Sequence, residues 1–390
     1  LEKVQLGCRQ SPEDPESLVL LANCLVANQR DVEALALIEK ILKVKSDYAE
    51  AYSVRSLIKS RAKDIVGAID DAKMTVSIKP HLTQMWQLLG SWHYQNSNLR
   101  DAIEALRVAH NSEPNNPAFM IQLGELLRQD NKASEAITIL RKATKLTPKD
   151  ANAWTNFGVA LQHEKRMGDA KIAYEKALAL NPKSAAIANN LGVIAQQVGE
   201  WESALQYFGK ALEIEPNLAE AHGNFGNTLK ELGRLDEALA SYDQAIALKP
   251  DYAEAHSNLG VTLQELGRLD EALASYTQAI ALKPDCAEAH RMLTSMKKFD
   301  AQDEQYSKML ELYLNEEISE EQRCNINFGL AKACEDLGNF EQAFIHYNEG
   351  NVIRKRLLNY DINQDVELFE QLKSNYPMIE KNSLLPDKLS

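Results

Sequence analysis

The chain has 390 residues, with 43 Lys or Arg against 56 Asp or Glu, and its formal net charge is -13 at pH 7. This acidic balance disfavours nucleic acids and anionic membranes as partners, because both attract clustered positive charge. No run of about 18 apolar residues could span a bilayer, so we expect a protein or peptide partner, no nucleic acid and no membrane. Five scattered cysteines without a CxxC pair are typical of reduced thiols and predict a cytoplasmic location.

Residues 1–14 keep the register of a repeat that fills most of the sequence. They are predicted to be the second helix of a truncated repeat whose first helix is missing. Because repeat proteins more often begin with a polar capping helix, we expect the sequence to be a fragment of a longer protein.

The repeat has a period of 34 residues. Proline recurs at 80, 114, 148, 182, 216, 250 and 284, an alanine stands twelve residues before each of them, and glycine fills the eighth place of six consecutive repeats. Eight tandem units cover 15–286, here called repeats 1 to 8: 15–48, 49–82, 83–116, 117–150, 151–184, 185–218, 219–252 and 253–286. This self-similarity indicates a repeat protein, which buries apolar faces between neighbouring units and has no single core.

Each repeat is predicted to form two helices, as repeat 7 illustrates. Its first half, AEAHGNFGNTLKEL, places apolar or small residues at helical spacing, so one face can be buried. Gly233 then provides a C-terminal stop, and Asp236 is expected to cap the second helix with its side chain. Asp251 and Glu254 predict a capping box at the start of repeat 8.

Small residues predict close packing of the two helices. Gly226 and Ala238 lie where large side chains would hold the helices apart, so the axes can approach to about 8–10 Å. Repeat 2 departs most from this pattern, because Arg55, Ser56 and Lys59 replace the usual leucine, glycine and apolar residue.

The pattern resembles the tetratricopeptide repeat family. The resemblance is carried by WTNFGVALQ at 154–162, followed by Ala170, Tyr174, Ala177 and Pro182. It implies an all-α fold, a right-handed α-solenoid superhelix of tandem helix-turn-helix repeats with the first helices on the concave side. It also implies a protein-protein interaction scaffold.

After residue 286 the strict register ends. Residues 287–323 are predicted to be a degenerate helical connector, and 324–357 a degenerate repeat. Ser319 and Gln322 form a predicted capping box ahead of that repeat. The remainder, 358–390, is predicted to contain a short helix at about 364–374 and a polar tail.

This C-terminal block carries a second, narrower resemblance. RMLTSMKKF, then NFGLAKACEDLGNFEQAFIHYNEGN at 327–351 and Tyr360, is similar to the segment that joins repeats to the catalytic domain in bacterial repeat-containing sulfotransferases. The resemblance implies an alternative role, in which the chain is the non-catalytic, substrate-recruiting region of such an enzyme. The catalytic domain would lie beyond residue 390.

No motif in the chain predicts chemistry. GxxxxGK[ST], GxGxxG and GxSxG are absent, so we expect no enzyme activity, no catalytic residues and no cofactor. His222, His256 and His290 lie 34 residues apart, too far apart in space for one metal, and are expected to replace the aromatic residue of earlier repeats. We therefore expect no metal site. The pair Asp70 and Asp71 is expected to lie on a solvated acidic face.

The strongest functional signal is a ladder of side-chain amides at the sixth place of consecutive repeats: Gln122, Asn156, Asn190, Asn224 and Asn258. An amide offers both a donor and an acceptor, so a ladder facing a concave groove can bind the backbone of an extended peptide. Similar ladders line the superhelix of O-linked N-acetylglucosamine transferases. The alternative interpretation is that these amides bond to the preceding helix or to water and set the superhelical pitch.

Overall fold

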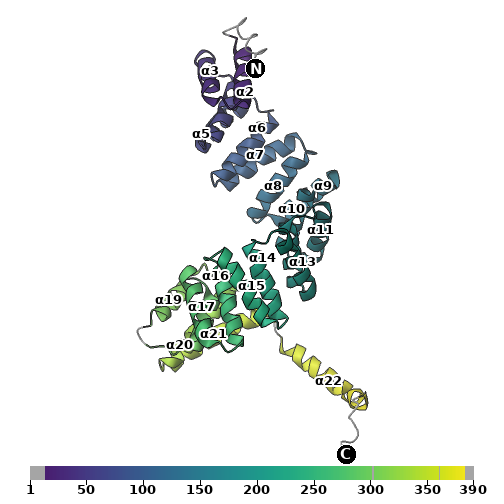
Figure 1. Ribbon diagram of the computed structural model, residues 1–390, viewed down its shortest axis with the longest axis vertical. Helices are drawn as coiled ribbons and strands as arrows, with labels where there is room; N and C mark the ends of the chain where they lie inside the picture. Colours follow the sequence, from purple (N-terminus) through teal and green to yellow (C-terminus); the bar gives the residue numbers. More distant parts are fainter. Residues whose placement is uncertain (1–13, 301–302, 360, 383–390) are drawn as a thin grey trace, which may run out of the picture. The chain divides into compact units, whose positions relative to one another are not determined.

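The computed structural model describes residues 14–300, 303–359 and 361–382, with the backbone alone at 364 and 375–382. The chain divides into two compact bodies, Leu1–Ile214 and Glu215–Ser390, called here the N-terminal and C-terminal bodies. The described residues form helices and no strands, as Figure 1 shows along the chain. The all-α fold of tandem helix pairs is therefore confirmed. The predicted helix in 1–14 lies outside the described residues, apart from residue 14.

The N-terminal body contains six helix pairs. Its helices are α2 (Pro15–Ala27), α3 (Asp31–Val44), α4 (Ala49–Arg61), α5 (Ile65–Ile78), α6 (Thr83–Gln95), α7 (Leu99–Ser112), α8 (Pro117–Gln129), α9 (Ala133–Leu146), α10 (Ala151–His163), α11 (Met167–Leu180), α12 (Ala185–Gln197) and α13 (Trp201–Ile214). The two helices of each pair pack together, and the second helix also packs on the first helix of the next pair.

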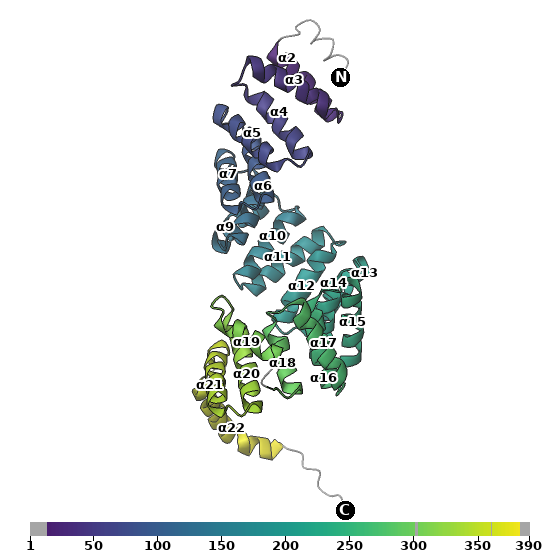
Figure 2. The same ribbon diagram turned by 90° about the vertical axis from the view of Figure 1, so that its left-hand side faces the viewer.

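The C-terminal body begins with two further pairs of the same kind. Its helices are α14 (Ala219–Glu231), α15 (Leu235–Leu248), α16 (Ala253–Glu265), α17 (Leu269–Leu282), α18 (Ala287–Met296), α19 (Glu304–Leu314), α20 (Glu320–Asp336), α21 (Phe340–Leu357) and α22 (Ile362–Asn382). After α17 the pairing changes, because α18 packs on α17 and on α20 and has little contact with α19, the next helix in sequence, and α20 also packs on α21. Figure 2 shows α20 among α18, α19 and α21.

The turn inside every repeat uses a left-handed residue at the fifteenth place. Gly199, Gly233 and Gly267 have φ of 77°, 73° and 75°. The helix stop predicted at Gly233 is therefore confirmed. The first five repeats keep the same conformation without glycine, with φ between 56° and 63° at Gln29, Lys63, Ser97, Asn131 and Lys165. The geometry of the turn is therefore set by the packing of the helices, and glycine lowers its cost where present.

Two predicted helix caps are wrong. Helix α15 begins at Leu235, one residue before Asp236, and its cap residue makes no side-chain hydrogen bond. Helix α16 likewise begins directly after Tyr252, so Asp251 lies outside the cap position and forms no capping box with Glu254. A side-chain cap has to stand immediately before the helix.

The thirty-fourth place of each repeat decides whether such a cap exists. Asp150 accepts a hydrogen bond from the amide of Asn152 at the start of α10, whereas Tyr252 at the equivalent place cannot. The capping box of Ser319 and Gln322 is confirmed at the start of α20, where both reciprocal hydrogen bonds form.

Close packing inside the pairs of repeats 3 to 8 depends on the glycine at the eighth place. A Cβ at Gly226 would lie 2.8 Å from the ring of Tyr242, and one at Gly260 would lie 2.7 Å from the ring of Tyr276. Both tyrosine side chains are fully buried, so they form the contact between helices rather than an exposed aromatic surface. Burial raises the pKa of both phenols above the ordinary value of 10.0.

The C-terminal helix is longer than predicted. A short helix is expected at about 364–374, but α22 extends from Ile362 to Asn382. Among the described residues, no helix is long and apolar enough to cross a bilayer.

We predict that Gly226→Ala destabilises the C-terminal body, although alanine has the higher helix propensity. The added methyl would overlap the Tyr242 ring, at a cost of about 1–3 kcal/mol from overpacking. Gly209→Ala is the matched control, because nothing lies within 4 Å of its added methyl and it should stabilise by about 0.5–1 kcal/mol. Urea midpoints of the two variants should move in opposite directions, and parallel shifts would contradict the overlap.

His93 occupies an apolar place in repeat 3. The eleventh place is leucine in most repeats, including Leu127 and Leu161, but His93 is 5 % exposed and its Nδ1 has no hydrogen-bond partner among the described residues. Burial lowers its pKa below the ordinary 6.5, and the charge of Lys73 acts in the same direction. Asp101, 3.9 Å away, opposes the shift.

We predict that acid destabilises the N-terminal body through His93. Because the folded state disfavours the proton, this contribution to stability is fully present above about pH 6.5 and is lost as the pH falls through the lower folded pKa. His93→Leu should raise the melting temperature and reduce its fall between about pH 7.5 and about pH 5. The exposed His81→Leu serves as control. An unchanged pH profile in His93→Leu would exclude this contribution.

Candidate functional site

The five predicted ladder amides lie on the first helices of consecutive repeats, and all are half-buried. Gln122 on α8, Asn156 on α10 and Asn190 on α12 belong to the N-terminal body. Asn224 on α14 and Asn258 on α16 belong to the C-terminal body. Each body thus carries its own part of the predicted ladder.

Gln122 and Asn156 make hydrogen bonds inside the N-terminal body. Gln122 accepts one from the side-chain amide of Gln87 on the preceding first helix, at 2.9 Å. Asn156 donates to the carbonyl of Asn152 in its own helix, at 3.0 Å. These bonds orient the amides, and each amide keeps unused hydrogen-bonding groups.

The C-terminal body has three neighbouring hollows along α14, α16, α18 and α20. The first, the Asn224 hollow, measures about 450 Å³ and is lined by Glu220, Asn224, Lys249, Asp251, Tyr252, Ala253, Glu254, Leu282 and Lys283. The second, the Asn258 hollow, measures about 370 Å³ and is lined by Glu254, Ser257, Asn258, Lys283, Asp285, Cys286, Ala287, Glu288, Glu321, Gln322 and Asn325. The third measures about 250 Å³ and includes Arg291 and Arg354.

Shared lining residues make these hollows one continuous groove. Glu254 and Lys283 line both the first and the second hollow. Glu321 and Asn325 line both the second and the third. A continuous groove of this length suits an extended segment better than a compact small molecule.

Asn325 is a site residue that the sequence pattern does not identify. It lies on α20, beyond the end of the strict 34-residue register, and does not occupy a sixth place. Its amide nevertheless lines the same hollow as Asn258, because α18 packs on α20 and brings the two chain segments together. Only the polar character of α20 in its first two turns signals its position.

The three histidines do not form a metal site. The Nε2 atom of His222 lies 2.9 Å from the carbonyl oxygen of Pro216, and His290 makes the same contact with Pro284. The indole of Trp154 donates to the carbonyl of Pro148 in the equivalent place. Histidine therefore replaces tryptophan in a structural hydrogen bond, as predicted, and the described residues include no group that could hold a metal ion.

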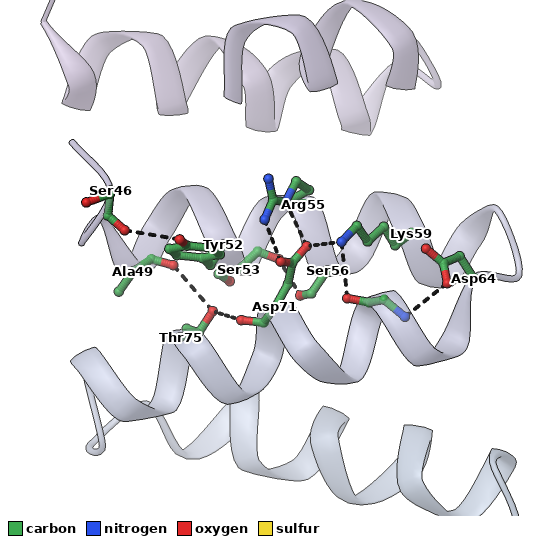
Figure 3. Close-up of polar contacts among 11 residues, drawn as sticks. Ser46, Ala49, Tyr52, Ser53, Arg55, Ser56, Lys59, Asp64, Asp71 and Thr75 are labelled. Carbon is green, nitrogen blue, oxygen red and sulfur yellow. Dashed lines mark hydrogen bonds and ion pairs between the residues drawn. The ribbon is translucent and has the colours of Figure 1, made fainter. Parts of the chain in front are cut away.

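Repeat 2 contains a buried charged cluster, drawn in Figure 3. The carboxylate of Asp71 accepts hydrogen bonds from Arg55 at 2.7 and 2.8 Å and pairs with Lys59 at 2.9 Å. Asp71 is 3 % exposed, so the predicted solvated face is wrong for this residue, although Asp70 is exposed. The hydrogen bonds that Arg55 donates to Asp71 raise the pKa of Arg55.

This cluster is structural. The carboxylate of Asp71 pairs with both cations across the α4–α5 contact, where other repeats place mostly uncharged residues such as leucine and alanine. The carboxylate is saturated by its two cations, which leaves it no reacting role. The residues in which repeat 2 departs from the pattern thus form an ionic contact between α4 and α5.

We predict that Asp71→Ala destabilises the N-terminal body by about 3 kcal/mol, because it leaves two cations without their buried partner. The triple variant Arg55→Leu/Lys59→Leu/Asp71→Ala, which installs residues of the neighbouring repeats, should be close to wild type in stability. The stabilities of both variants, measured by thermal unfolding, test this prediction. Equal destabilisation by the triple variant would show a need for the charges themselves.

Comparisons with known proteins agree with this architecture. Family models described as "Tetratricopeptide repeat" match residues 93–155, 149–216, 207–240 and 253–286, and one described as "TPR repeat" matches 226–267. These matches together cover 93–286 without a gap. A comparison with curated proteins gives no match.

Among the similar solved structures, the one with a TM-score above 0.5 supports the same fold. A chain of the APC/C hetero-tetramer Cut9-Hcn1 is 17% identical with a TM-score of 0.51; the match covers 72% of this chain and 56% of that one. YrrB, described as a TPR protein with an unusual peptide-binding site, is 28% identical over 48% of this chain and 96% of its own, with a TM-score of 0.41. PilF of Pseudomonas aeruginosa is 21% identical over 55% of this chain and 97% of its own, with a TM-score of 0.49.

Proposed function

Because this chain is a tetratricopeptide repeat protein, we propose that it is an interaction scaffold that binds an extended peptide or protein segment in a concave groove. The contacts are made by the amide ladder of Gln122, Asn156, Asn190, Asn224 and Asn258. These side chains bind the peptide backbone, so the groove accepts more than one sequence.

The observation that supports this proposal best is the continuous groove of the C-terminal body. Asn224 and Asn258 line neighbouring hollows that share Glu254 and Lys283. In addition, the side-chain amide of Asn258 has no hydrogen-bond partner among the described residues. An unengaged amide beside an open hollow is available to a ligand.

The alternative interpretation, in which the amides only stabilise the scaffold, fits the N-terminal body less completely. Gln122 and Asn156 do make internal hydrogen bonds. Asn190 has none within the described part of the chain, although it occupies the same place in its repeat. A purely structural ladder would have to engage every equivalent amide.

The role in a bacterial sulfotransferase remains a second proposal, which rests on the resemblance of 290–376. It is compatible with the first, because a peptide groove would recruit substrates to an enzyme. Reading the gene beyond Ser390 tests it. A following domain with a phosphate-cradling loop is expected, and a stop codon or an unrelated domain would refute it.

The peptide proposal is tested with a random dodecapeptide library displayed on phage and selected on the full chain. Selected peptides are labelled and their affinities measured by fluorescence anisotropy. The variant Asn156→Ala/Asn190→Ala/Asn224→Ala/Asn258→Ala should bind up to about 1,000-fold more weakly, since each lost hydrogen bond contributes about 1 kcal/mol.

A matched control changes four exposed asparagines outside the ladder to alanine: Asn152, Asn217, Asn348 and Asn351. It should bind as wild type does. Circular dichroism of both variants verifies the fold. Wild-type affinity in the folded ladder variant would refute the proposed contacts.

A further inference from the structure

The Asn258 hollow contains a buried hydroxyl without a partner. Ser257 is 2 % exposed, and its Oγ makes no hydrogen bond among the described residues. Other buried hydroxyls of this body donate to the carbonyl four residues earlier, as Ser275 does to Glu271 and Thr262 does to Asn258. An unsatisfied polar atom in such a place costs about 1–3 kcal/mol, so a ligand that engages it is favoured.

Comparison of repeats 7 and 8 explains why Ser257 lines its hollow while the equivalent Gly223 does not line the Asn224 hollow. The two repeats agree at 28 of 34 residues, and two of the differences are Gly223 against Ser257 and Tyr252 against Cys286. In repeat 7 the Tyr252 ring covers Gly223, where an added Cβ would lie 3.1 Å from that ring. In repeat 8 the smaller Cys286 leaves Ser257 lining the hollow.

Carboxylates outnumber cations in the lining of this hollow. Glu254, Asp285, Glu288 and Glu321 line the hollow, together with Lys283 as the single cation. None of the four carboxylates takes part in a salt bridge within the described residues. The four come from α16, the α17–α18 turn, α18 and α20, so the fold gathers negative charge here from separate segments.

We propose that the Asn258 hollow binds one cationic side chain, a lysine or an arginine, of the extended peptide held by the ladder. This inference rests on the proposed function and adds the specificity that backbone contacts lack. The ammonium or guanidinium group donates to Ser257 and lies among the carboxylates, while Asn258 holds the adjacent peptide backbone. A charged donor in a recess lined by carboxylates makes stronger hydrogen bonds than a neutral one.

The first test uses the dodecapeptides selected on the wild-type chain. They should carry Lys or Arg at one fixed position. Replacing that residue by its neutral counterpart, norleucine or citrulline, should weaken binding by about 10-fold on wild type, as expected for loss of a charge-assisted contact of about 1.5 kcal/mol.

Substitutions in the Asn258 hollow test whether the preference for cationic peptides arises there. Glu254→Gln/Glu288→Gln/Glu321→Gln should reduce the difference between cationic and neutral peptides to less than about twofold. Ser257→Gly/Cys286→Tyr, which transplants the pair already present in repeat 7, should do the same by removing the hydroxyl and covering its place with a ring. Asp236→Asn/Asp243→Asn/Asp270→Asn makes an equal change of charge outside the hollow and should keep the full difference.

A second test does not depend on the ladder. Argininamide should slow the alkylation of Cys286, followed residue by residue with mass spectrometry, and the amide of citrulline should not. The protection should vanish in the triple glutamine variant. Unprotected Cys286 at saturating argininamide would refute the cation site.

The outcomes separate the two proposals. Selected peptides without a fixed cation, or an equal loss from norleucine on wild type and on the glutamine variant, overturn the cation site and leave the ladder standing. Cys286 protection together with peptides that ignore the ladder mutations overturns the ladder and leaves the cation site. A selection that yields no binding peptide counts against the ladder. Protection of Cys286 by argininamide then tests the cation site by itself.

Discussion

The contact between the eighth and the twenty-fourth places of each repeat is the constraint on which the rest of the structure depends. Glycine at the eighth place lets a large side chain from the second helix lie directly on the first helix, as Tyr174 does on Gly158 and Phe208 does on Gly192. This contact sets the separation and rotation of the two helices, and therefore which residues face the next repeat and which face the groove. The amides at the sixth place keep their position because this contact keeps its register.

Repeat 2 shows that the spatial requirement is stricter than the chemical one. Without glycine or a large apolar partner, the α4–α5 contact is made by Asp71 with Arg55 and Lys59. The helix pair keeps its place in the array because ion pairs between the two helices, at neighbouring places, hold them together. The turns show the same rule for the backbone. Lys63 and Gly233 are different residues at the same place of their repeats, and both have a left-handed φ.

The groove of the C-terminal body arises from small departures within a conserved scaffold. Replacement of the Tyr252 ring by the smaller Cys286 leaves place five of repeat 8 uncovered, and Ser257 supplies a hydroxyl there. Helix α20 then supplies Glu321 and Asn325 from a segment that no longer follows the repeat. Repetition builds the scaffold and the ladder of amides, and the places where repetition fails add Ser257, Glu321 and Asn325 to the Asn258 hollow.

The sequence by itself determined the period, the helix pairs, the glycine contact and the replacement of Trp154 by His222, because the same kinds of residue recur at the same places of successive repeats. It placed the ladder amides on first helices for the same reason. Only the tertiary structure decided that Asp71 is buried, that Asp236 and Asp251 cap no helix, and that Asn325 lies beside Asn258. These depend on which side chains neighbouring helices bring within reach, and after residue 286 the 34-residue register no longer carries that information.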